Sequence, residues 1–238
     1  MQYVLDSHTH TLASGHAYNT IHEMVQAASE KGLHLLGITE HAKSMPGTCH
    51  EIYFANLRVL RRQMAGIEVM FGVEANIMDK SGRLDMEERL LKRMDVVVAS
   101  LHIPCMTPGT EEENTEAVLG AIRNPYVNII GHPDDGRYPL DYEKIVRAAK
   151  EHHVLLEVNN TSLNPQGFRK NARENIRTML ELCRRYEAPV ILDSDAHCAE
   201  DVGNCCYSEE IIAETAFPEE LIVNRSVEEY KKFINRFK

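Results

Sequence analysis

The stretch "DSHTHT", residues 6–11, follows the short apolar run "YVL" near the start of the chain. Side chains of a strand alternate between its two faces, so His8 and His10 point the same way. Such a pair is typical either of an exposed polar strand end or of two imidazoles that hold a metal ion. The rest of the sequence decides between these two interpretations.

Short apolar runs alternate with longer amphipathic segments along the chain. The apolar runs predict seven strands, at residues 3–8, 35–40, 68–75, 96–102, 127–132, 154–159 and 190–195, and a weaker eighth at residues 221–224. The segments between them predict helices at residues 21–31, 54–64, 85–93, 115–123, 142–153, 175–186 and 227–237. Strands that alternate with helices in this way form a parallel sheet with the helices outside it.

An open doubly wound sheet and a closed barrel would both contain these elements. The sequence has no G-x-G-x-x-G turn after its first strand and no Walker loop. Polar groups follow nearly every predicted strand, and a barrel gathers all of its strand ends at one mouth. These observations favour a closed barrel. Because no linker or low-complexity stretch interrupts the pattern, residues 1–238 are expected to form one domain.

Side chains of the kind that bind zinc, iron or manganese lie at or just after the strand ends. They are His8, His10, His16, His41, Glu74, His102, His132, Asp195 and His197. Seven of the 12 histidines belong to this set, whereas chance would spread histidines over helices and loops as well. Nine ligands are too many for one zinc ion, which takes about four, so two or three ions are expected.

Composition narrows the classes of function. The formal net charge is -10, which argues against broad binding to nucleic acid or to a membrane surface. No apolar run approaches the roughly 18 residues of a membrane span. The six cysteines are scattered without a C-x-x-C pair, and no signal peptide is evident, so a cytoplasmic location is predicted. The oligomeric state cannot be read from the sequence, and a homo-oligomer stays open.

Seven motifs carry a family resemblance. In chain order, "DSHTHT", "ITEH", "GVEAN", "ASLH", "GHPD", "LEVNNTS" and "DSDAH" resemble the motifs of the polymerase and histidinol phosphatase (PHP) family over nearly the whole chain. The stretches "CHEIYFANLRVL" and "GVEANIMDKSGRLD" also resemble the short, stand-alone YcdX-like phosphatases. The resemblance implies a distorted (β/α)7, TIM-like barrel with a trinuclear metal site, often zinc. Zinc is the first candidate for this chain, and sites of histidine and carboxylate ligands also accept manganese or iron.

The resemblance also assigns ligands to each ion. One ion would take His8, His10, Glu74 and Asp195, a second Glu74, His102 and His132, and a third His16, His41 and His197. All nine motif positions are filled. The loops "TPGTEEENTEA" and "HPDDGRYPLD" depart more from the family pattern, which leaves the substrate open.

The function predicted from these residues is hydrolysis of small phosphate monoesters. Metal ions lower the pKa of bound water, and two ions roughly 3.5–4 Å apart would bridge the resulting hydroxide. The candidate catalytic residues are Asp195, His197, Glu74 and Asp134, the last as the acid that protonates the leaving group. The candidate phosphate-binding residues are Asn160, Arg58, Arg61 and Arg169, and the candidates that orient imidazoles are Asp6, Glu40 and Asp193.

Three other functions stay open from the sequence. Amidohydrolases also begin with H-x-H and end on a strand with aspartate, but they usually depend on a bridging lysine or carboxylate, and no lysine ends a predicted central strand. A nuclease or phosphodiesterase is compatible with the family, although the small chain and its negative charge disfavour it. A binding module that keeps metal for structure alone is the third alternative.

Overall fold

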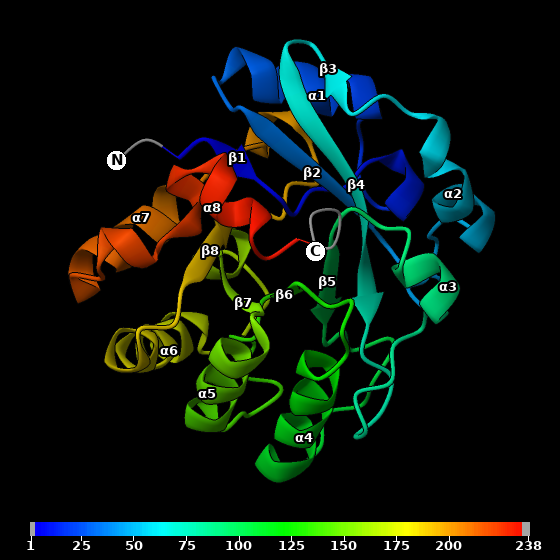
Figure 1. Ribbon diagram of the computed structural model, residues 1–238. Coiled ribbons are helices and arrows are strands. Elements are labelled where there is room, and N and C mark those ends of the chain that lie inside the picture. The colour runs from blue at the N-terminus through cyan, green and yellow to red at the C-terminus, as the bar shows by residue number, and fades with distance from the viewer. Residues whose placement is uncertain (1–2, 235–238) are drawn as a thin grey trace.

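The computed structural model describes residues 3–234 and contains one sheet. Its strands are β1 (Leu5–Asp6), β2 (Leu35–His41), β3 (Gln63–Met64), β4 (Ile67–Asn76), β5 (Val97–Ser100), β6 (Ile129–Ile130), β7 (Leu155–Asn159) and β8 (Val190–Asp193). Seven of them are parallel and adjacent in the order β1-β2-β4-β5-β6-β7-β8, while β3 pairs antiparallel with β4 (Figure 1). Because the spatial order follows the chain, the sheet curls into a nearly closed barrel, which confirms the predicted fold.

Helices connect the strands and cover the outside of the barrel. They are α1 (Ile21–Glu30), α2 (Glu51–Asn56), α3 (Glu88–Leu91), α4 (Glu111–Ile122), α5 (Tyr142–His152), α6 (Ala172–Tyr186), α7 (Cys206–Thr215) and α8 (Val227–Lys231). Figure 1 shows α4, α5 and α6 outside the strands that they connect. Capping boxes open α1 and α4, where Thr20 pairs with Glu23 and Thr110 with Glu113. No helix of residues 3–234 is long and apolar enough to span a membrane.

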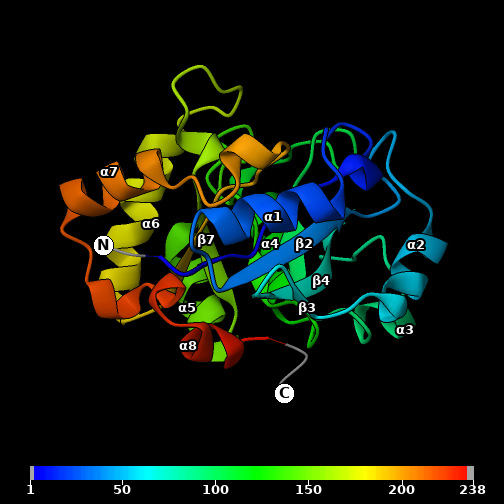
Figure 2. The same cartoon turned by 90° about the horizontal axis from the view of Figure 1, so that it is seen from above.

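The barrel interior is apolar at its floor and polar toward its mouth. Each of the seven parallel strands places one buried side chain in the floor layer: Leu5, Leu35, Met70, Val98, Ile129, Leu155 and Ile191. Tyr230 of α8 and Ile234 pack against this layer and close the floor. Helix α8 lies at the lower edge of Figure 2. Because strand side chains alternate, the next inward positions lie two residues later, and they are small or polar: Ser7, Gly37, Gly72, Ser100, Gly131, Glu157 and Asp193. The sequence thus changes from large apolar residues to small or polar ones at the same level of every strand.

Side chains rather than a strand ladder join β1 to β8. Within residues 3–234 the two strands share no ladder, and an isolated bridge links Thr9 to Ala196 near the mouth. Below the bridge, the Ser7 amide donates to Asp193 Oδ1 at 2.6 Å, and the Ser194 amide donates to Asp6 Oδ1 at 3.2 Å. Both serine hydroxyls donate to the same carboxylates as their amides. Each strand therefore supplies an aspartate that binds a serine of the other.

Asn224 closes the seam between β1 and β8 nearer the floor. Its side-chain oxygen accepts the Leu192 amide at 2.8 Å, and its side-chain nitrogen donates to the Leu5 and Leu192 carbonyls at 3.2 and 2.6 Å. One amide side chain thus satisfies backbone groups on both β1 and β8. This replaces the main-chain pairing that a closed barrel would have at this position.

The strands end earlier than predicted at several ligand positions. Residues 127–132 and 190–195 were expected to be strands, yet β6 ends at Ile130 and β8 at Asp193. His132 and Asp195 have φ of 30° and 55°, in the left-handed region that a strand cannot contain. The backbone therefore leaves the sheet where it presents these two side chains to the mouth.

Other expected elements are also corrected. The helix expected at residues 54–64 ends with α2 and a 3-10 turn at Leu57–Val59, because Ala65 and Gly66, at φ of 47° and 82°, turn the chain so that β3 pairs with β4. The helix expected at residues 85–93 shrinks to α3, since the Asp85 carboxylate accepts the Asn76 amide and stays in the loop. The weak strand at residues 221–224 consists of 3-10 turns around one bridging residue, Ile222.

Helix ends differ as well. The sequence did not predict α7, and α4 and α6 begin earlier than expected. The final helix begins as expected at Val227, with Ser226 as its cap, and ends at Lys231. The last part of the range predicted for it, residues 235–237, lies outside the described residues.

The seam predicts unequal effects for two aspartate variants. Burial, with the charges of Asp6 and Glu157, raises the pKa of Asp193 well above its usual value, so an amide at this position replaces a group that already favours its neutral form. Asp193→Asn keeps an acceptor for the Ser7 amide and is expected to change the free energy of unfolding by less than about 1 kcal/mol.

Asp6→Asn is the matched comparison. Asp6 Oδ2 accepts the Ser194 hydroxyl and the Gly203 amide, while Oδ1 accepts the Ser194 amide. Either orientation of the new amide faces its NH₂ group toward a backbone donor, so a loss of about 1–3 kcal/mol is expected. Urea unfolding of both variants in metal-free buffer measures the difference, and equal destabilisation would contradict this account of the seam.

Candidate metal centre

The nine candidate ligands meet at one end of the barrel. They come from the strand ends and following loops of β1, β2, β5, β6 and β8, and from Glu74 within β4. A cavity of about 520 Å³ opens above them, and six of the nine line it: His16, His41, His102, His132, Asp195 and His197. His8, His10 and Glu74 are fully buried beneath it. This is the carboxyl end of the strands, where barrels carry their functional groups.

Glu74 lies at the centre of the cluster. Five imidazole nitrogens approach its carboxylate within 3.4 Å, and they belong to His8, His10, His41, His102 and His132. Oε2 faces His8, His10 and His41, whereas Oε1 faces His102 and His132. The two oxygens of one carboxylate therefore face two different groups of nitrogens, as in a carboxylate that bridges two ions.

Four atoms, one each from His8, His10, Glu74 and Asp195, have the spacing of a tetrahedral site. His8 Nε2 lies 3.4 Å from Glu74 Oε2 and 3.7 Å from Asp195 Oδ1. His10 Nε2 lies 3.4 Å from each of the same two oxygens. Zinc with bonds of about 2.1 Å in tetrahedral geometry holds its ligand atoms about 3.4 Å apart. These four atoms are thus spaced as ligands of one ion.

Unpartnered buried atoms provide an independent test of this fit. His8 Nε2, His10 Nε2, His41 Nδ1 and Glu74 Oε2 are all buried without a hydrogen-bond partner. Buried polar atoms are nearly always hydrogen-bonded, because desolvation without a partner is costly. The three nitrogens lie within 3.4 Å of Glu74 Oε2, an arrangement that fits bound cations.

A further group lies nearer the cavity. His16 Nε2 is 3.2 Å from His41 Nε2, and the imidazole rings of His16 and His197 are 4.9 Å apart. The nitrogens of His10, His41 and His197 lie within 4.8 Å of one another. His41 faces Glu74 through Nδ1 and His16 through Nε2, so it stands between this group and the first one.

The electrostatics of the cluster favour the protonation states that bind metal. Burial alone would raise the pKa of Glu74, but the charges of His41, His102 and His8 outweigh it and hold that pKa well below its usual range. Burial, with the charges of His41 and His197, lowers the pKa of His10 well below its ordinary value. Ionised carboxylates and neutral imidazoles are the forms that donate electron pairs to a cation.

Asp195 and His102 follow the same rule. Burial would raise the pKa of Asp195, yet the His8 charge, the hydrogen bond to His10 and the Arg169 charge hold it well below its usual value. Burial lowers the pKa of His102. His8 differs, because the charges of Glu157, Glu74 and Asp195 outweigh its burial and raise its pKa well above the ordinary value.

Glu157 holds two of the ligands in place, and the sequence analysis missed it. Its Oε1 lies 2.6 Å from His8 Nδ1, and its Oε2 accepts the His132 amide at 2.5 Å and the Asn159 side chain at 3.0 Å. A carboxylate on Nδ1 orients the ring so that Nε2 faces the site. The available signal was a glutamate on the inward face of an otherwise apolar strand, two residues before Asn159.

Neutral side chains orient two other imidazoles. Ser14 Oγ lies 2.9 Å from His10 Nδ1 and donates to Glu40 Oε2 at 2.6 Å, so Glu40 reaches His10 through a serine. Asn76 Oδ1 lies 2.7 Å from His102 Nδ1. Asp6 and Asp193, which were also expected to orient imidazoles, bind the serines of the seam instead.

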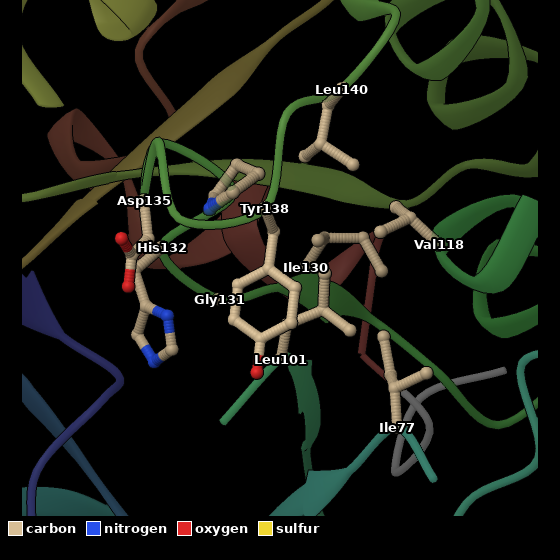
Figure 3. Close-up of a pocket in the computed structure, with 10 residues that line it drawn as sticks. Ile77, Leu101, Val118, Ile130, Gly131, His132, Asp135, Tyr138 and Leu140 are labelled. Atoms are coloured by element: carbon tan, nitrogen blue, oxygen red, sulfur yellow. The ribbon is translucent and has the colours of Figure 1, made fainter. Parts of the chain in front are cut away.

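Close packing behind the ligands holds them from the other side. A Cβ at Gly131 would lie 2.3 Å from Ser100 Oγ and 2.8 Å from Val98 Cγ1, so these two side chains of β5 leave room only for a glycine there, and His8 Cε1 packs at 3.5 Å from the same position. A pocket of only about 10 Å³ lies behind His132, where apolar side chains surround Tyr138 (Figure 3). It is about the size of one water molecule and leaves no room for a ligand on that side.

Of the predicted phosphate-binding residues, the structure brings Arg169 to the site. Its side chain is 7% exposed and lines the cavity. Nη2 lies 3.2 Å from Asp195 Oδ2, and Nη1 donates to Ser162 Oγ at 2.9 Å and Asn159 Oδ1 at 3.2 Å. These three contacts hold the guanidinium against the cavity wall next to a ligand carboxylate.

The other predicted residues lie elsewhere. Among the described residues, the cavity lining includes none of Arg58, Asn160 and Asp134. Arg58 and Arg61 are exposed, Arg58 beside a different groove on the outside of the barrel. Asn160 Oδ1 accepts the amides of Tyr207 and Ser208 at the start of α7. Asp134 is fully enclosed, and burial raises its pKa to about 7.

Comparisons with known proteins agree with this geometry. A family model described as the PHP domain matches residues 6–186. A probable phosphatase of Caldicellulosiruptor bescii is 45% identical over 230 residues, which cover 97% of this chain and 95% of the relative. A probable phosphatase of Clostridium novyi is 46% identical over 224 residues, which cover 94% and 91%.

A solved structure has a similar fold. It is the crystal structure of histidinol phosphate phosphatase from Lactococcus lactis, complexed with zinc, L-histidinol and phosphate. The TM-score is 0.61 at 19% sequence identity, over 91% of this chain and 95% of the other. The family model and the full-length relatives together establish that this chain belongs to the PHP domain family.

Proposed function

We propose that the protein is a metal-dependent phosphatase that hydrolyses small phosphate monoesters at a site of three divalent ions. The observation that carries this proposal is the convergence of buried, unpartnered ligand atoms beneath an open cavity. Relatives about as long as this chain, named probable phosphatases, support the reaction class. The whole chain would act as a single phosphatase domain.

The ligand sets are those that the family resemblance implies, and the distances between their atoms support them. His8, His10, Glu74 and Asp195 would hold one ion, Glu74, His102 and His132 a second, and His16, His41 and His197 a third. Zinc is the first candidate, because imidazole and carboxylate ligands at tetrahedral spacing suit it, with manganese and iron as alternatives. When bound, such ions lower the pKa of coordinated water and polarise phosphoryl oxygens.

Arg169 is the residue of this chain that we assign to the phosphate. Its guanidinium is held at the wall of the cavity beside Asp195, where it can donate charge-assisted hydrogen bonds to a phosphoryl oxygen. Because three protein contacts already orient it, little side-chain freedom is lost when phosphate binds. Its charge also opposes repulsion of the anionic substrate by the acidic chain.

Finer assignments belong to the same proposal. We place the chain in the YcdX-like subgroup, because the relatives match it over 95% and 91% of their own lengths rather than as part of a larger polymerase. The cytoplasmic location stays a prediction from the cysteine pattern. L-Histidinol phosphate enters any substrate screen, because the solved structure of similar fold is named for it.

One prediction from this proposal concerns metal content and turnover together. Protein purified without chelator or metal-affinity resin is expected to contain about three ions per chain by plasma mass spectrometry, as nine ligands require. His10→Ala removes a ligand that faces both Glu74 and Asp195, so metal content and p-nitrophenyl phosphate turnover should both fall.

His153→Ala serves as the control, because His153 lies at the end of α5, away from the cavity lining. It should keep both properties. One ion or none, even after zinc and manganese are offered back, would refute the three-ion site. Full metal content without hydrolysis of any phosphate ester would instead support a module that holds metal for structure alone.

Another prediction from this proposal concerns Glu157. Glu157→Gln leaves one acceptor where two carboxylate oxygens now serve His8, His132 and Asn159. Loss of such an orienting group costs about 10–100-fold in metal affinity. Competition with a fluorescent zinc chelator measures that affinity, and Glu112→Gln, on the exposed side of α4, is the matched control. An affinity equal to that of the unaltered protein would show that Glu157 does not position the ligands.

A further inference from the structure

The cavity extends well beyond the metal ligands. At about 520 Å³ it is several times larger than a phosphate ion, so part of it must receive the rest of the substrate. Besides the six candidate ligands, ten residues line the cavity, and five of them are apolar residues from the loops after β2, β5 and β7: Met45, Leu101, Ile103, Pro104 and Phe168. The loop that carries Phe168 projects at the upper edge of Figure 2, on the side opposite α8.

Two of these side chains are unusually exposed. Phe168 is 67% exposed and Ile103 is 41% exposed. A large apolar side chain loses hydrophobic free energy when it stays in water, and a cluster of such side chains at a cavity marks a binding surface. Their exposure provides apolar area that a bound group would cover.

The ring of Phe168 is held in place by cations. The guanidinium carbons of Arg137 and Arg169 lie 5.1 and 5.3 Å from its centroid, within the range of cation–π attraction. Arg169 is itself anchored to Asp195, and Arg137 donates from Nε to Asp135 Oδ2 at 2.8 Å. The exposed ring therefore rests on two anchored side chains.

The polar side chains of the outer wall are already paired with the protein. Thr161 Oγ1 donates to the Ser194 carbonyl at 2.8 Å, and the Arg137 guanidinium is paired with Asp135. The Asp201 carboxylate accepts the Cys198 thiol at 3.2 Å. A hydroxyl-rich group would have to compete with these contacts within the protein, whereas an apolar group would cover the exposed carbon surface without disturbing them.

On the basis of the proposed phosphatase function, we propose that this outer wall is the subsite for the alcohol part of the substrate. It selects phosphate esters whose alcohol carries an uncharged aromatic ring over esters of polyhydroxylated alcohols. An aromatic ring covers a large apolar area and needs no hydrogen bonds from the wall, and the Phe168 ring offers an aromatic contact. Phe168 is thus a specificity-determining residue, remote from the reacting bond.

The test compares two primary alkyl esters with the metal-loaded protein. In 2-phenylethyl phosphate and glycerol 3-phosphate the leaving groups are both primary alkoxides, so the comparison reports mainly on recognition. The unaltered protein should show a kcat/KM at least about 10-fold higher for 2-phenylethyl phosphate. Phe168→Ala should lower that value about 10-fold and leave kcat/KM for glycerol 3-phosphate within about 2-fold.

Two further variants keep the result interpretable. Ile103→Ser changes the wall on a different loop and should also lower kcat/KM for the aromatic ester selectively. Ile52→Ala is the matched control, because Ile52 is 71% exposed but lies on α2, outside this cavity lining. It should leave both values unchanged.

The outcomes separate this inference from the function on which it rests. Hydrolysis of both esters with equal kcat/KM would refute the aromatic subsite and leave the phosphatase function intact. An equal loss on both esters in Phe168→Ala would also refute it, since the ring would then act on the shared phosphate end through Arg169. If p-nitrophenyl phosphate and both alkyl esters all resist hydrolysis, the proposed function and the subsite fail together.

Discussion

The seam between the first and last strands is the constraint on which the metal centre depends. His8 and His10 follow β1, Asp195 and His197 follow β8, and the two strands meet through side chains rather than a ladder. The His10 amide donates to the Ala196 carbonyl at 2.9 Å, so the backbone closes between the two pairs of ligands. The 3.4 Å separation of His10 Nε2 from Asp195 Oδ1 therefore depends on the register of this seam.

Local strain accompanies this arrangement. His132 and Asp195 hold left-handed φ values, which cost about 1–3 kcal/mol each for residues with a side chain. The Glu157 carboxylate holds the His132 amide, and the Thr9–Ala196 bridge follows directly after Asp195. The surrounding structure thus imposes a backbone that neither residue prefers, and both side chains turn into the mouth.

Most of the barrel could be predicted because parallel strands buried on both faces appear as apolar runs. Helix α7 could not, since the group that caps it is far away in the sequence. Asn160 accepts the amides of Tyr207 and Ser208, in the first turn of this helix, from 47 and 48 residues upstream, and the side chain of Cys205, just before the helix, provides no cap. Asn160 was assigned to the phosphate because a polar residue at a strand end was expected to face the mouth. Its side chain faces α7 instead.

The positions of the nine candidate ligands could be predicted because imidazoles and carboxylates recur at or just after the strand ends in chain order. The groups that orient them could not be predicted as easily, because their residue types are common elsewhere. Ser14 and Asn76 resemble any polar residue of a turn or strand end until their distances to His10 and His102 are known. Long side chains on irregular loops were hardest to place: Arg169 folds back to the cavity, and Arg58 remains in solvent.

Without a bound cation, the same cluster lowers the stability of the folded chain. Buried nitrogens and a carboxylate without partners destabilise a protein, because desolvation is not offset by hydrogen bonds. A cation that binds these atoms in the folded chain, and not in the unfolded one, stabilises the fold by mass action. Stability and metal content are then linked through one equilibrium. The side-chain contacts between β1 and β8, together with Glu157, hold the candidate ligands close together although their burial is unfavourable without metal. A bound cation would offset that loss of stability.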